Sequence, residues 1–124
     1  MHRRADPGRR RAAGGSPGAT THWAYHRLLE RLGATYLPER WVEDGKFITS
    51  AGVSAGIDMA LALVARLTDE PTARMVQLAI EYDPHPPFVG IDWDQVNRDI
   101  YQPMLDPMVK QQLADRPELL AKLS

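Results

Sequence analysis

His22 is the residue whose type and position are best suited to chemistry. It follows Thr20 and Thr21 and precedes Trp23, at or near the predicted start of a helix. An imidazole there can act as a general acid or base, or as the partner of a thiolate. A histidine at a helix start can also cap the helix or pack against its neighbours, and the spacing alone favours this second role. His22 is therefore a candidate catalytic residue with a structural alternative.

His26 raises the question of a metal site. It stands four residues after His22, the i, i+4 spacing of two ligands on one helix face. No Glu directly follows His22, and no third ligand is evident in the sequence. We therefore predict no metal site and no cofactor.

A loop of small residues, Ser50–Gly56, leads from a predicted strand into a predicted helix. Backbone N–H groups between Gly52 and Gly56 could bind an oxyanion or an anionic ligand. The loop matches neither the dinucleotide-binding nor the Walker pattern. Asp58 is the only acidic residue within the apolar helix that follows. It either interacts with the helix dipole, the favoured role, or is a buried site carboxylate.

The composition limits the kinds of chemistry that this chain can perform. Its 124 residues include no Cys, which excludes disulfides, thiolate zinc sites and a cysteine nucleophile within the chain. The length fits one domain. No apolar run approaches the roughly 18–20 residues of a membrane span, and the charged start lacks the apolar core of a secretion signal. These features predict a cytoplasmic protein that has no membrane partner.

Charge is distributed unevenly along the chain. Residues 1–21 contain five Arg and one acidic residue, whereas the remainder contains ten basic and fifteen acidic residues. Residues 1–18 lack large apolar residues after Met1, so we predict a disordered basic segment. A basic arm could bind nucleic acid. No aromatic residues interleave the arginines, however, so a solvated tail or a displaced reading frame is favoured and no nucleic-acid partner is predicted.

The elements that must position these residues follow from periodicity and turn signals. The sequence predicts a helix over His22–Leu32 that ends at Gly33, then a short extended run, Ala34–Leu37. An Asp44-Gly45 pair between two alternating runs, Arg40–Glu43 and Lys46–Thr49, predicts a hairpin.

The second half of the chain is predicted to be mostly helical. A helix over Ile57–Leu67, capped by Ser54, is apolar nearly all round, which predicts that several neighbours enclose it. Further helices are expected near residues 70–81, 93–101, 107–114 and 118–123, with an extended segment around Pro84–Pro87. A strand, a glycine turn and a buried helix in succession favour an α/β sandwich.

Three stretches together resemble a known family: Ala19–Trp23, Ile48–Asp58 and Gln77–Pro84. In this order and spacing they are similar to the ThiJ/PfpI family (the DJ-one/PfpI group of the class I glutamine-amidotransferase-like superfamily), above all to its isonitrile hydratase-type members. The resemblance covers about residues 19–88 and matches only the C-terminal half of the family's domain. Residues 89–124 are then expected to form a helical C-terminal tail.

The resemblance implies a partial flavodoxin-like three-layer α/β sandwich that lacks the N-terminal strands. Family members usually form homodimers and carry a cysteine nucleophile and an acidic partner, which would both precede Ala19. Neither can be assigned here, so we expect a truncated or frame-shifted gene product. His22 matches the histidine beside the nucleophile, and Gly52 and Ile57 match the loop that borders the substrate pocket. Asp58 matches a structural position.

The predicted function is that of a protein related to cysteine-dependent isonitrile hydratases and amidotransferase-like hydrolases, inactive alone because the nucleophile is absent. A small molecule is the substrate of intact relatives, and a homodimer is expected. One alternative is the ligand-sensing module of an AraC-type transcription regulator, although only about 40 residues follow Tyr82. Another is a non-catalytic dimerisation remnant.

Overall fold

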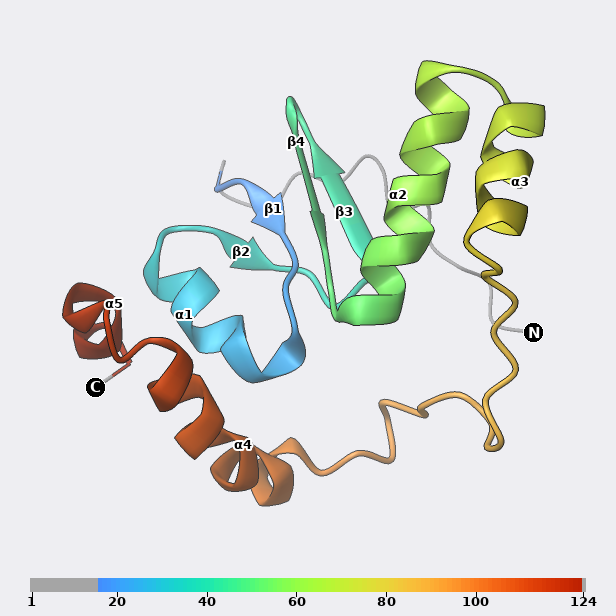
Figure 1. Cartoon of the computed structure of the whole chain (residues 1–124). Coiled ribbons are helices and arrows are strands. Elements are labelled where there is room, and N and C mark those ends of the chain that lie inside the picture. The colour runs from blue at the N-terminus through green and yellow to red at the C-terminus, as the bar shows by residue number, and fades with distance from the viewer. Residues whose placement is uncertain (1–15, 124) are drawn as a thin grey trace.

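The structure is a computed structural model that describes residues 16–123 (Figure 1). In chain order its elements are β1 (Gly18–Ala19), the 3-10 turn η2 (Trp23–Tyr25), α1 (His26–Arg31), β2 (Thr35–Tyr36), β3 (Trp41–Asp44), β4 (Phe47–Ser50), α2 (Val53–Leu67), α3 (Glu70–Ala79), α4 (Arg98–Gln112) and α5 (Pro117–Ala121). Most of the segment predicted to be disordered, residues 1–15, lies outside the described residues. Gly18, at its end, begins β1.

Short strands and helices together confirm the predicted α/β class. β1 and β2 form a parallel pair, with Gly18 opposite Thr35 and Ala19 opposite Tyr36. β3 and β4 form an antiparallel hairpin. The helix predicted after His22 is present as η2 followed by α1, and it ends before Gly33, whose φ is +101°. These elements place His22 in the connection between β1 and η2.

Buried polar side chains join β1 to the hairpin. Asp44 Oδ2 accepts a hydrogen bond from the Gly18 N–H at 2.7 Å. The Thr20 N–H donates to Thr49 Oγ1 at 3.0 Å, and Thr20 Oγ1 donates to the Glu39 carbonyl at 3.3 Å. Thr20 is only 3% exposed, so these bonds satisfy groups that water cannot reach. They fix the backbone two residues before His22.

The predicted hairpin is confirmed, but its turn lies one residue later than predicted. Asp44 pairs with Phe47 across the strands, so the two turn residues are Gly45 and Lys46. Gly45 has a φ of +62°, which a type II′ turn requires at its first central position and which glycine adopts at little cost. Asp44 remains in the strand because its buried carboxylate holds the Gly18 N–H.

Helix α2 is less enclosed than its composition predicts. It begins at Val53, so the predicted cap, Ser54, lies in the first turn, and Gly52 is the N-cap residue instead. Within α2 only Ala55 is buried, whereas Val53 and Leu67 are 87% and 74% exposed. The hairpin lies along one side of the helix and α3 along another (Figure 1). The described residues leave the larger apolar side chains between Ile57 and Val64 half-buried and those at the two ends of the helix exposed.

The two helices predicted near residues 93–101 and 107–114 are wrong, because the structure has one continuous helix, α4, in their place. Asn97 caps α4, and Pro103 and Pro107 lie inside it. Each proline removes a backbone hydrogen bond. The burial of Val109 and Leu113 against the first helical segment compensates for that loss. The predicted helix at 70–81 and the last turn are present as α3 and α5.

The largest buried apolar cluster joins α4 and α5 to η2 and α1. Its buried members are Ala24, Leu28, Val109 and Leu113. Gln102 Nε2 donates to the Ala24 carbonyl at 3.1 Å, which fixes the same contact through a polar bond. This buried cluster therefore packs against η2 and α1, the segment that directly follows His22. No helix among residues 16–123 has both the length and the apolar character that crossing a bilayer requires.

Candidate active site around His22

His22 is held by its backbone and by one of its ring nitrogens. It is the N-cap residue of η2, with φ −53° and ψ 135°, and its Nδ1 accepts the Ala24 N–H at 3.1 Å. A nitrogen that accepts a hydrogen bond carries no proton, so the neutral ring has its proton on Nε2. The structure thus confirms the capping role and leaves an Nε2–H donor for chemistry.

Two aromatic rings fix the orientation of the imidazole. The Trp23 ring is stacked on it at a centroid distance of 5.9 Å, and the Tyr25 ring meets it edge-on at 6.2 Å. His22 is half-buried. Because the cap uses Nδ1 and any reaction would use Nε2, the two predicted roles of His22 are compatible.

The glycine loop reaches the imidazole although thirty residues separate the two in sequence. A Cβ built on Gly52 would lie 3.7 Å from His22 Cδ2. Gly52 is also the N-cap residue of α2, a 15-residue helix whose start has no side-chain cap hydrogen bond. The first N–H groups of such a helix lack intrahelical partners, and the helix dipole adds positive potential there. An anion beside His22 would therefore be stabilised from two sides.

The other two predicted residues lie further along α2. Ile57 is half-buried in the second turn and offers only an apolar side chain. Asp58 Oδ2 accepts hydrogen bonds from Arg40 Nη2 at 2.6 Å and Nε at 3.1 Å, and Oδ1 accepts the Tyr82 hydroxyl at 2.6 Å. The hydrogen bond to Asp58 raises the pKa of Tyr82 above its ordinary value. Asp58 thus joins three segments, as a structural residue would.

His26 does not form a metal pair with His22. Its Nδ1 lies 2.7 Å from the Trp23 carbonyl oxygen, and its ring contacts Tyr36 at 5.5 Å. In the described part of the chain no three His, Cys, Asp or Glu side chains are placed to hold a metal ion.

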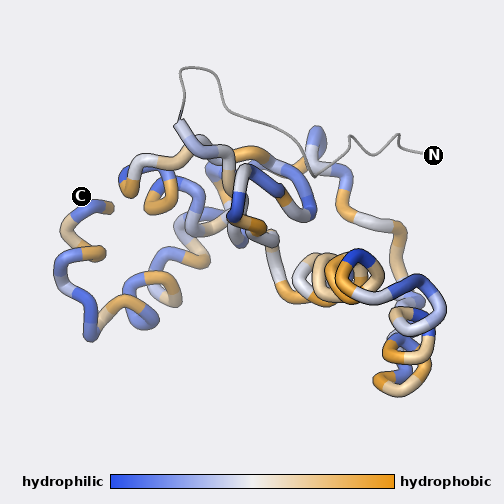
Figure 2. Tube along the Cα trace, turned by 90° about the horizontal axis from the view of Figure 1, so that it is seen from above, coloured by the Kyte–Doolittle hydropathy of each residue, from blue (hydrophilic) through white to orange (hydrophobic). Residues whose placement is uncertain are grey.

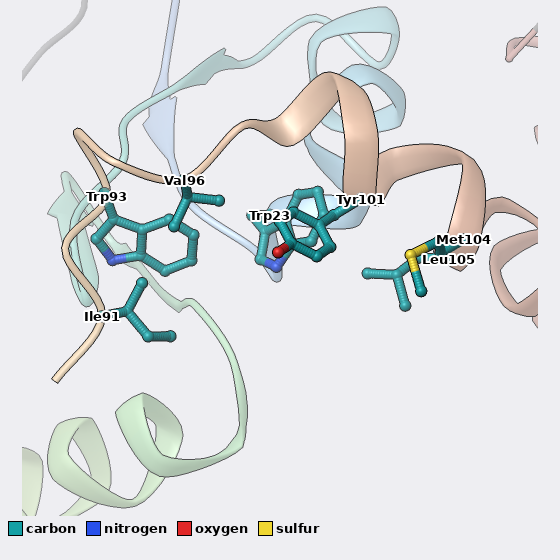
Figure 3. A pocket seen from close by; sticks show the side chains of 7 residues that line it. All are labelled: Trp23, Ile91, Trp93, Val96, Tyr101, Met104 and Leu105. Atoms are coloured by element: carbon teal, nitrogen blue, oxygen red, sulfur yellow. The ribbon is translucent and has the colours of Figure 1, made fainter. Parts of the chain in front are cut away.

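An apolar cavity lies next to the Trp23 side chain. It has a volume of about 310 Å³ and is lined by Trp23, Ile91, Trp93, Val96, Tyr101, Met104 and Leu105 (Figure 3). The Arg98 guanidinium lies 5.1 Å from the Trp93 ring centroid. This lining can take up hydrocarbon, and its one hydroxyl group belongs to Tyr101.

Sequence reasoning missed three polar residues that position the site: Arg40, Thr49 and Tyr82. Thr49 and Tyr82 both lie within the stretches that carry the family resemblance, which is the signal that could have found them. No comparable signal marks Arg40, because an Arg at the start of a predicted strand is common on solvated surfaces.

Known proteins resemble this chain over part of their length. No family model matches it. It is 54% identical over 70 residues to the isonitrile hydratase of Pseudomonas putida, a match to 56% of this chain and 31% of that enzyme. The crystal structure of a ThiJ/PfpI family protein from Pseudomonas syringae superposes with a TM-score of 0.60 at 34% identity, over 84% of this chain and 40% of that one. The chain thus spans about a third of the curated relative, and its fold is that of part of a ThiJ/PfpI protein.

Proposed function

Since this chain is a ThiJ/PfpI family, isonitrile hydratase-like protein over the residues that match, we propose that it supplies part of a hydratase-like or hydrolase-like active site. The observation that carries the proposal is the position of His22. Its Nε2–H has no hydrogen-bond partner among residues 16–123, and the uncapped start of α2 lies beside the ring. Together these groups can stabilise an anion.

The proposed reaction begins with the attack of a cysteine thiolate on an electrophilic carbon, such as that of an isonitrile. His22 Nε2–H would donate a hydrogen bond to the thiolate, and the N–H groups after Gly52 would stabilise negative charge that develops on the substrate. The former isonitrile carbon then takes up a proton from water to give a thioimidate, a water molecule adds to that carbon, and expulsion of the thiolate with return of the proton releases an N-substituted formamide. Ile57, on the same helix, would contact the apolar part of the substrate.

The chain has no cysteine, so we propose that its 124 residues have no hydratase activity alone. A small molecule is the proposed substrate. A homodimer and a cytoplasmic location remain proposals of the same kind, which light scattering and cell fractionation can test. The ligand-sensing module of an AraC-type regulator and the dimerisation remnant also remain predictions, and no feature of residues 16–123 favours either.

A chimera tests the proposed site directly. In the P. putida isonitrile hydratase, the matched 70-residue stretch is replaced by that of this chain, and isonitrile hydration is measured. We expect the chimera to be active. The H22A change should lower kcat/KM about 100-fold or more, a typical cost of removing one hydrogen-bond donor that stabilises an anion.

The matched control is H26A, which removes the other histidine of the same segment. His26 contacts the Trp23 carbonyl and Tyr36, so its loss should change kcat/KM by less than about threefold once folding is verified. Equal losses in H22A and H26A would contradict a role for His22. So would turnover by the 124-residue chain without any added cysteine.

A further inference from the structure

Helix α2 carries an exposed apolar stripe. Val53, Ala60 and Leu67 recur at i, i+7 and i+14, which places them on one face of the helix, and all three are exposed. Val53 and Leu67 are 87% and 74% exposed. In Figure 2 the tube of this helix, which lies between the hairpin and α3, carries hydrophobic colour at many of its residues. A helix face of this kind is normally covered by protein.

Helix α3 repeats the pattern. Pro71, Met75 and Leu78 recur at i, i+4 and i+7 and are all exposed, Met75 at 69% and Leu78 at 79%. The buried residue of α3, Ala73, lies on another side of the helix. Residues 70, 74 and 77 form the polar face, where Glu70 and Arg74 pair with each other. The apolar stripe therefore adds to the surface that α2 leaves open.

Within residues 16–123, the parallel pair of β1 and β2 also lacks the further hydrogen-bonded strands that such a pair normally has. β1 and β2 form a parallel ladder of two residues each. Parallel strands are found in sheets that have helices on both faces. This chain superposes on the P. syringae protein over 84% of its own length, yet it covers only 40% of that protein. Most of such a domain therefore consists of residues that this chain does not match.

We propose that the α2 and α3 stripes dock the complementary part of a ThiJ/PfpI α/β domain, that is, the part that this chain does not match. Docking would bury Leu67 and Leu78, which are 74% and 79% exposed in the described residues. The activity expected of the assembled site rests on the proposed function. The contact between the two stripes and the complement is inferred separately, from their exposed apolar surface.

The test is co-expression of this chain with the tagged, unmatched part of the P. putida isonitrile hydratase. We expect co-purification and a one-to-one mass by light scattering. The L67K/L78K variant should weaken the complex at least about tenfold, because it places charges in an apolar contact. The matched control, F88K/V89K, changes two residues that are 81% and 95% exposed but lie outside both helices, and it should bind like the wild type.

Hydrogen exchange of the wild-type pair gives a second readout that needs no variant. Amides of α2 and α3 should exchange at least about tenfold more slowly in the complex than in the chain alone. The proposal is overturned when the complement fails to co-purify, when F88K/V89K weakens it as much as L67K/L78K does, or when the stripes instead pair two copies of this chain. A complex that does not hydrate isonitriles refutes the proposed function and leaves the docking intact. If the chimera is active but the separate pieces do not associate, the docking is refuted and the proposed function stands.

Discussion

Asp58 links three segments of the chain, so its removal should measurably lower the stability of the fold. Its carboxylate lies on α2 and joins Arg40, just before β3, to Tyr82, just after α3. The D58A change removes both contacts at once. It would also leave the Tyr82 hydroxyl and the Arg40 guanidinium without the acceptor that holds the three segments together.

The magnitude follows from exposure. The side chains of Arg40 and Asp58 are 42% and 22% exposed, so solvent screens the pair and its contribution is about 0.5–1 kcal/mol. The hydrogen bond from Tyr82 to a charged acceptor is partly buried and should contribute about 1 kcal/mol. We therefore expect D58A to lower the free energy of unfolding by about 1.5–2 kcal/mol, and Y82F by about 1 kcal/mol.

Urea unfolding followed by circular dichroism measures these losses. The matched control is E70A, which breaks an Arg–carboxylate pair on α3 whose side chains are 74% and 69% exposed and should cost about 0.5 kcal/mol or less. In the double variant D58A/Y82F the losses should not add, since both changes remove the same bond. Equal losses for D58A and E70A, or full additivity with Y82F, would refute this assignment.

Two further predictions concern titration and the hairpin turn. The pKa of Tyr82 is raised in the folded state, so the stability from its bond to Asp58 is fully present below the unfolded tyrosine value near about 10 and is lost as pH rises through the folded value. The stability difference between the wild type and Y82F, measured by urea unfolding from pH 7 to 11, should thus be constant to about pH 9 and close above about pH 10. A difference that already closes between pH 7 and about pH 9 would contradict this prediction. G45A should lower the free energy of unfolding by about 1 kcal/mol because Gly45 has a φ of +62°. G90A, at a glycine with open space and no positive φ, should change it by less than about 0.5 kcal/mol.

Local sequence signals predicted most elements but not their neighbours. The Asp44-Gly45 pair located the hairpin, yet the turn begins one residue later because Asp44 has a tertiary partner, the Gly18 N–H, 26 residues away. The prolines of α4 suggested two helices, because the burial of Val109 in a distant cluster has no local signature. The nearly all-round apolar composition of Ile57–Leu67 predicted that several neighbours enclose this helix, whereas the described residues cover only part of α2. In each case a long-range contact, present or missing, decided the outcome.

The site was predictable only as far as the family resemblance extended. Spacing alone made His22 a cap, and the structure agrees. Only the resemblance placed Gly52 in the same site, and the structure brings that backbone to the imidazole. Arg40 and Tyr82, which hold Asp58, had no signal as a pair, since neither periodicity nor composition relates residues that meet through a third side chain.

The bond at Nδ1 decides which proton chemistry His22 can perform. While Nδ1 accepts the Ala24 N–H, a neutral ring can only donate from Nε2, so in the proposed reaction His22 would stabilise an anion rather than remove a proton. Two amide variants of the active chimera separate the nitrogens: the Asn of H22N can imitate the Nδ1 acceptor, and the longer Gln of H22Q can imitate the Nε2–H donor. We expect H22Q to retain at least about tenfold more kcat/KM than H22N, and H22N to be the more stable of the two. The reverse order of activities would show that the cap, and not the donor, is what the reaction requires of His22.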